Sequence, residues 1–299
     1  MNDRRRTIGR RALLRGSIAL ALAPARVRAA AELDRIREAG KAAGLEPFQA
    51  VETEAFQGIG DAPKAFMVEA LGLCETLAAD YRKHFERKGF ALTRPAAKLR
   101  VILLSSPRAY AAFEKQHDLE KAVGGHYDLT ANQQVTFDSR SGGPDATPNA
   151  LRINTFTLVH ETVHQLTFNT GVLDRSHDTP VAISESLATY AETWGPRRTG
   201  EIGRTNRLRL DGRRGDRWIP LERLLTEDAL FEDEATQLTA YVEAWLLGYY
   251  FLKDLGRTPK FRSYLAAVRE NPDPGRRIAI ASEHLGDLAR LDRLLQRSR

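Results

Sequence analysis

The stretch TLVHETVHQLTFNTG, residues 157–171, places two histidines and a glutamate in a mostly apolar segment. His160 and His164 are four positions apart, so in a helix they project from one face, one turn apart. That spacing lets two imidazoles bind one Zn²⁺ at about 2.0–2.1 Å. Glu161 lies beside the ligand direction, where it can take a proton from an attacking water instead of binding the metal. The stretch therefore predicts a zinc site that has its own general base.

The H-E-x-x-H pattern is short but specific. With seven histidines in 299 residues, a chance occurrence is expected in about one of 100 such chains. Its neighbours are uncharged, as expected for a helix buried under a metal site: Val159, Thr162, Val163, Gln165 and Leu166. Gly171 is expected to end the helix. The alternative is a helix with two hydrogen-bonded histidines near its surface, which is disfavoured because unpartnered buried imidazoles cost free energy.

A catalytic zinc site needs a third protein ligand and an open position for water. The segment PVAISESLATYAE, residues 180–192, is expected to form a helix with Pro180 in its first turn. Glu185 lies inside its apolar sequence and is the favoured third ligand. His177 and Asp178, in the preceding loop, are competing candidates, and an ordinary surface glutamate is the other interpretation of Glu185.

The elements that would position these residues follow from hydrophobic spacing and turn signals. In the first part of the chain we expect a helix over 32–44, a hairpin in 47–60, and a helix that Asp61 caps, with Pro63 in its first turn, and that runs to Gly89. A strand over 98–104, with alternating Leu99, Val101 and Leu103, is followed by a Ser106-capped helix over 106–116 and by two extended pieces in 125–138 around Ala131 and Asn132. A loop over 139–149 then leads to helices from Ala150 on, including 240–256 and 283–297. Strands come first and helices later, which predicts an α+β fold. Residues 32–299 are expected to form one domain, with a sheet lobe of about 45–170 and a helical lobe of about 171–299.

The net charge of +6 is concentrated at the amino terminus. Residues 1–31 hold eight arginines and one acid, which leaves 37 basic and 38 acidic residues in 32–299. Nucleic-acid binding is not expected, because it needs a basic face on the folded domain.

Residues 1–31 are expected to be an export signal peptide. An arginine-rich start precedes a short apolar run over 17–23 and an alanine-rich segment that ends near Ala31. Arg10 and Arg11 resemble a twin-arginine signal; a basic amphipathic or disordered tail is the alternative. No run is long enough to span a bilayer. We expect a periplasmic or extracellular protein without stable membrane insertion.

The single cysteine, Cys74, excludes an internal disulfide and a cysteine-based metal site. It is expected in the core of a helix whose apolar residues recur at helical spacing: Phe66, Ala70, Leu73, Leu77, Tyr81 and Phe85.

The run HETVHQLTFNTG followed by P-x-x-x-S-E-S-L-A-T-Y-x-E resembles gluzincins among the zincin-like metallopeptidases, and more closely the DUF1570 family, which is related to the MA-type peptidases. GHYDL, IGRTNRLRL and AYVEAWLLGYYFL also fit, so that the resemblance covers about residues 95–265. It implies a zincin-like fold, in which a small mixed sheet lies over the motif helix and a mostly helical carboxy-terminal lobe closes the cleft. The edge strand lining the cleft is expected within 125–138.

The resemblance also implies roles for particular residues. It makes His160, His164 and Glu185 the ligands of one Zn²⁺ per chain, with Glu161 as the base. It makes Tyr241 the candidate donor to the oxyanion; a core tyrosine near Trp245 is the alternative interpretation.

The expected edge strand carries further candidates. His126 is a second possible oxyanion donor. His126 and Tyr127 are expected to bind an extended substrate that adds to the edge through its main chain. Arg204, Asn206 and Arg209 are candidates for a substrate carboxylate, although a solvated helix face is the default expectation for such residues.

The sequence departs from the gluzincin pattern at two positions. Ser186 follows the third ligand where a glycine is common. Thr189 stands where many gluzincins have an acid that orients a ligand histidine, and a threonine hydroxyl accepts a hydrogen bond more weakly than a carboxylate.

These features predict an exported zinc metallopeptidase that acts on a peptide or protein substrate. The alternatives are a zincin-like domain that binds metal or a partner without catalysis, and a zinc hydrolase of cell-wall peptide amides. The intact Glu161 favours an enzyme. Cleavage preference and oligomeric state are not predicted.

Overall fold

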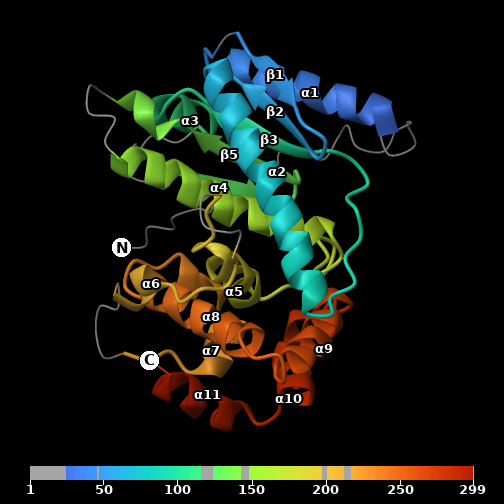
Figure 1. Cartoon of the computed structure of the whole chain (residues 1–299), viewed down its shortest axis with the longest axis vertical. Helices are drawn as coiled ribbons and strands as arrows, with labels where there is room; N and C mark the ends of the chain where they lie inside the picture. The colour runs from blue at the N-terminus through green and yellow to red at the C-terminus, as the bar shows by residue number, and fades with distance from the viewer. Residues whose placement is uncertain are drawn as a thin grey trace, which may run out of the picture.

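The computed structural model describes residues 25–45, 47–115, 124–142, 148–196, 201–211 and 217–298. The fold is α+β, as predicted, with the sheet in the first half of the chain and helices in the second (Figure 1). The arginine pair of the predicted export signal lies outside the described residues. Within them, no helix combines the length and the apolar character that a bilayer crossing requires.

Among the described residues, the sheet has five strands in the order β1-β2-β3-β5-β4. Their bounds are β1 (Gln49–Glu52), β2 (Phe56–Gly60), β3 (Leu99–Leu104), β4 (Gly125–Asp128) and β5 (Gln133–Phe137). The three central strands are parallel, whereas β1 and β4 pair antiparallel at the two edges. The predicted hairpin in 47–60 is confirmed, and β4, which lies within 125–138, is an edge strand.

Helices cover both faces of the sheet. Ile36 of α1 (Ala25–Ala42) and Tyr110 of α3 (Pro107–Phe113) pack on one face, and α2 (Lys64–Arg87) and α4 (Pro148–Asn169) pack on the other. Burial on both faces explains why Ile102 and Leu104 are as buried as the alternating residues from which β3 was predicted. α1 begins before residue 32 and therefore overlaps the predicted signal peptide.

Two helix starts differ from the prediction. Asp61 does not cap α2, which Pro63 precedes. Its carboxylate instead accepts hydrogen bonds from the Ser105 backbone N (2.9 Å) and Oγ (2.6 Å), so it joins the ends of β2 and β3. The predicted loop over 139–149 contains a 3-10 turn, η2 (Ser139–Gly142), and the first residues of α4. The Ser106 cap of α3 is confirmed, since its Oγ accepts from the Ala109 N at 3.1 Å.

The second half of the described chain is helical. It comprises α5 (Val181–Ala191), α6 (Arg207–Asp211), α7 (Leu221–Thr226), η3 (Asp228–Phe231), α8 (Gln237–Leu252), α9 (Thr258–Arg269), η4 (Pro274–Arg276), α10 (Arg277–Leu285) and α11 (Leu288–Arg297). The region 283–297, predicted as one helical segment, is two helices. Gly286 has a φ of 94° and breaks it, and Asp287 then caps α11 by accepting from the Arg290 N at 2.9 Å.

The long helix α2 connects the sheet to the helical half (Figure 1). Cys74, at its centre, is fully buried as predicted, with Sγ 3.2 Å from the Thr162 Oγ1 of α4. Just beyond its carboxy-terminal end, Lys88 Nζ donates to the carbonyl oxygen of Leu252 in α8. One hydrophobic core therefore extends from the helices beneath the sheet to α11.

Helices α5 and α8 approach closely at Gly248. A Cβ at this position would lie 2.6 Å from the carbonyl oxygen of Ser186, which is backbone and cannot rotate away.

The substitution Gly248→Ala is expected to lower the free energy of unfolding by about 1–3 kcal/mol, because the two helices must separate. Urea unfolding followed by circular dichroism measures the change. Gly72→Ala is the control: this exposed glycine of α2 has no other heavy atom within 4 Å of the added Cβ, so its substitution should be neutral or stabilising. Equal stability of the two variants would contradict the close packing of α5 on α8.

Candidate metal centre

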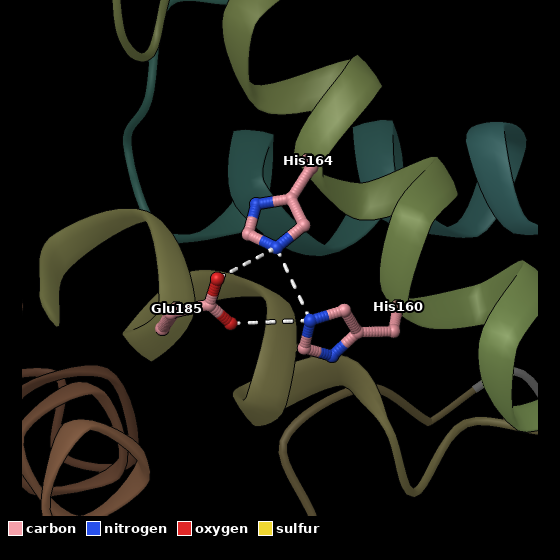
Figure 2. A group of neighbouring side chains, drawn as sticks. All are labelled: His160, His164 and Glu185. Atoms are coloured by element: carbon pink, nitrogen blue, oxygen red, sulfur yellow. Dashed lines mark hydrogen bonds and ion pairs between the residues drawn. The ribbon is translucent and has the colours of Figure 1, made fainter. Parts of the chain in front are cut away.

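Three side chains from two helices converge on one point. Helix α4 supplies His160 and His164, and α5 supplies Glu185 (Figure 2). The Nε2 atoms of the two histidines are 3.1 Å apart, and the Glu185 carboxylate lies 3.1 Å from His160 Nε2 and 3.3 Å from His164 Nε2. The candidate ligand atoms all lie within 4.8 Å of one another. Two imidazole nitrogens and one carboxylate are a donor set that suits Zn²⁺.

The two helices hold these groups because their other faces are buried. Val159 and Val163 are fully buried in the core beneath the sheet, so the histidines one position further along project toward α5. In α5, Ile183 and Leu187 flank Glu185 and are also fully buried. Helix α4 ends at Asn169, and a φ of 83° at Gly171 fits the predicted end signal. Pro180 directly precedes α5 instead of lying in its first turn.

The electrostatics of the cluster fit a bound cation. Burial favours the neutral form of Glu185, but the charge of His164 and hydrogen bonds from both imidazoles hold its pKa below the usual range. Burial opposes the charged form of His160 as well, yet Glu185 and Glu192 raise its pKa well above 6.5. Two imidazole nitrogens that face each other at 3.1 Å need a proton or a cation between them. A divalent metal would meet the same requirement.

The other nitrogen of His160 has a carboxylate partner that the sequence analysis missed. Its Nδ1 is 2.8 Å from Glu192 Oε1, and the Glu192 side chain is only 1% exposed. A carboxylate behind a ligand histidine fixes which ring nitrogen faces the metal. Glu192 lies seven residues after Glu185, or two helical turns, so this spacing could have indicated it. Thr189, at the position expected for such an acid, instead donates to the backbone oxygen of Glu185 at 2.5 Å.

Glu192 is in turn held by two of the residues considered for a substrate carboxylate. Asn206 Nδ2 donates to it at 2.8 Å, and Arg209 donates through Nε at 2.9 Å and Nη2 at 2.5 Å. The expectation of a solvated face is therefore wrong for both. Arg204 is exposed and lies 3.9 Å from Glu201.

The two competing third ligands are bound elsewhere. His177 Nδ1 lies 2.5 Å from the carbonyl oxygen of Arg269, and Asp178 forms an ion pair with Arg277 at 2.7 Å. Glu185 is the acid that the structure brings to the two histidines.

Glu161 lies on the side of α4 that faces the edge strand. Thr157, one turn before Glu161, packs against Gly124, the residue that directly precedes β4. The contact is so close that a Cβ added to Gly124 would lie 2.4 Å from the Thr157 Oγ1. Burial raises the pKa of Glu161, against the opposing effect of the charges on His160 and His164.

Tyr241 of α8 lies beside the cluster. Its ring centroid is 6.4 Å from that of His160 and 5.3 Å from that of Phe231. Burial and the charges of Glu185 and Glu161 raise its pKa, so the hydroxyl stays protonated and can donate. The alternative neighbour, Trp245, stacks on Tyr249 with centroids 4.9 Å apart.

The structure does not bring His126 and Tyr127 into the three-residue cluster. His126 Nδ1 lies 2.8 Å from Tyr110 Oη, and its side chain is 38% exposed. Tyr127 donates to Asn132 Oδ1 at 2.6 Å and stacks on Phe168 of α4. Tyr127 thus holds the β4–β5 turn against α4, whereas His126 points to the opposite face of the edge strand.

Comparison with known proteins agrees with part of the resemblance. None of the curated proteins compared with the sequence matches it. A family profile matches a shorter part of the chain than the expected span of about 95–265. The match begins after the last strand of the sheet, so it includes neither β4 nor the other strands. Residues 154–272, which contain the three converging residues together with Glu161, Glu192, Arg209 and Tyr241, match the profile of a family described as "Protein of unknown function (DUF1570)".

Proposed function

We propose that the chain is an exported, zinc-dependent metallopeptidase of gluzincin type on a zincin-like fold. The observation that carries this proposal is the convergence of His160, His164 and Glu185, with Glu161 on the adjoining face of the same helix. The mixed sheet with an antiparallel edge strand over α4 supports it. Export rests on the composition of residues 1–31.

In the proposed peptide hydrolysis, each residue of the site has a separate role. His160, His164 and Glu185 would hold one Zn²⁺, which when bound supplies a Lewis acid that activates water and polarises a carbonyl. Glu161 takes the proton of the attacking water and passes it to the leaving amine. Tyr241 donates a hydrogen bond to the oxygen on which negative charge develops. An extended peptide can add to β4 through main-chain hydrogen bonds, since among the described strands only β5 pairs with β4.

Glu192 supports the first ligand in this scheme. With the metal bound, Glu192 would accept a hydrogen bond from His160 Nδ1, which leaves the unprotonated Nε2 as the ligand atom. The same contact keeps the imidazole plane fixed when the metal is absent.

The zinc content of the purified full-length chain tests the site. We expect about one zinc per chain and loss of most of it in Glu185→Ala, because a three-ligand site loses its only carboxylate. Elemental analysis measures the metal, and circular dichroism shows whether the variant is folded. Glu270→Ala, at an exposed glutamate, is the matched control and should retain zinc. A folded wild-type chain that holds no zinc after incubation with the metal would refute the proposal.

A further inference from the structure

Arg209 occupies an unusual position for an arginine on a short surface helix. Its side chain is only 18% exposed. Two of its nitrogens, Nε and Nη2, bind the two oxygens of Glu192 at 2.9 and 2.5 Å. This two-pronged arrangement is the strongest contact that an arginine makes with a carboxylate, and it also fixes the plane of the carboxylate.

The same guanidinium lies against two aromatic rings of the site. It is 4.9 Å from the ring centroid of Tyr241 and 5.8 Å from that of Phe156. Phe156 in turn stacks on His160, with centroids 6.4 Å apart. Arg209 therefore contacts the carboxylate behind His160, the aromatic ring above His160, and the ring of the proposed oxyanion donor.

We propose that Arg209 is a positioning residue that holds both the Glu192–His160 pair and the ring of Tyr241 in place. This inference rests on the proposed zinc peptidase function. Glu192 is almost completely shielded from water, and a buried carboxylate needs hydrogen-bond donors, which here also fix its orientation. Arg209 supplies a full charge and two donors, whereas Asn206 supplies a single neutral donor. The carboxylate held in this way lies 2.8 Å from His160 Nδ1 and so fixes the orientation of the imidazole ring.

Zinc affinity of the full-length chain, measured by competition with a chromophoric chelator, tests this role without any assay of activity. Arg209→Ala is expected to weaken zinc binding by about 10–100-fold, as for other groups that orient a ligand. Arg209→Lys should lie between the alanine variant and the wild type, because lysine restores the charge but not the two-pronged contact. Arg207→Ala is the matched control, since this residue is exposed on the same helix. It should bind zinc like the wild type.

A double-mutant cycle with Glu192→Gln separates positioning from a general effect on folding. In the Glu192→Gln background, adding Arg209→Ala should change the zinc affinity by less than about threefold, because the carboxylate that Arg209 holds is gone. Equal losses in the two backgrounds would overturn the inference. If peptide hydrolysis is detected, Arg209→Ala at saturating zinc should lower kcat more than it raises KM, because Tyr241 acts on the transition state.

The failure of this inference is distinguishable from the failure of the proposed function. A wild-type chain that binds zinc, beside a folded Arg209→Ala variant with the same affinity, would overturn only the role of Arg209. A wild-type chain that binds no zinc would overturn both. Should the alanine variant not fold, Arg209→Lys decides, because a wild-type affinity in this variant would show that the two-pronged contact is not needed.

Discussion

The substitution Glu161→Gln is expected to lower kcat/KM for peptide hydrolysis by about 10²–10⁴-fold, the range for loss of a general base. Glutamine has nearly the same shape but cannot take the proton of the attacking water. Glu161 is not among the converging ligands, so the variant should keep its zinc. The measurement is cleavage of an unstructured protein by wild type and variant at equal zinc content.

The control for this assay is Glu86→Gln, at an exposed glutamate on α2, which should leave cleavage unchanged. Full activity of Glu161→Gln with zinc bound would show that the base lies elsewhere. A wild-type chain that binds zinc but cleaves no protein would favour the non-catalytic metal- or partner-binding domain. Cleavage of cell-wall peptides alone would favour the amide hydrolase.

The juxtaposed residues His160, His164 and Glu185 could be predicted because their signals are local. Two histidines four positions apart must share a helix face, and a glutamate within an apolar helical stripe needs a partner. The support for these residues could not be predicted in the same way. The only indication of Glu192 in the sequence is its spacing of seven residues from Glu185. Its partner Arg209 lies in α6, the next helix along the described chain, and meets Glu192 only in the folded protein. Nothing local distinguishes Arg209 from a solvated arginine.

The fold shows the same division between local and long-range information. The antiparallel pairs β1–β2 and β4–β5 join strands that are adjacent in sequence. The first was predicted as a hairpin, whereas β4 and β5 were predicted only as two extended pieces. The parallel pairing of β3 with β2 and β5 crosses two helices and depends on packing. Asp61 was assigned to the wrong partner for this reason: as a local cap it is well placed, but Ser105 offers it two donors from a strand 44 residues away.

A partly buried ion cluster at the start of α5 holds the helix that carries Glu185. Arg277 of α10, whose side chain is 8% exposed, binds Asp178 through Nε and Nη2, both at 2.7 Å. It also binds both oxygens of Asp228 at 2.9 Å, and Asp228 accepts a hydrogen bond from the Val181 N at the first residue of α5. One guanidinium thus joins α10 to the loop before α5 and to the acid that binds the start of this helix.

Arg277→Ala is expected to lower the free energy of unfolding by about 1–3 kcal/mol, because it leaves two acids without their shared cation; the loss is smaller than for a fully buried pair since the Asp228 side chain is 39% exposed. Urea unfolding measures the loss, and Arg276→Ala, at the exposed neighbouring arginine, should change stability by less than about 0.5 kcal/mol. The double variant Arg277→Ala/Asp228→Asn should recover part of the loss, since the amide removes one charge while its oxygen can still accept from the Val181 N. No recovery would mean that the loss comes from packing of the arginine stem instead of repulsion between Asp178 and Asp228. An Arg277→Ala chain as stable as the Arg276→Ala control would show that the cluster does not hold α5.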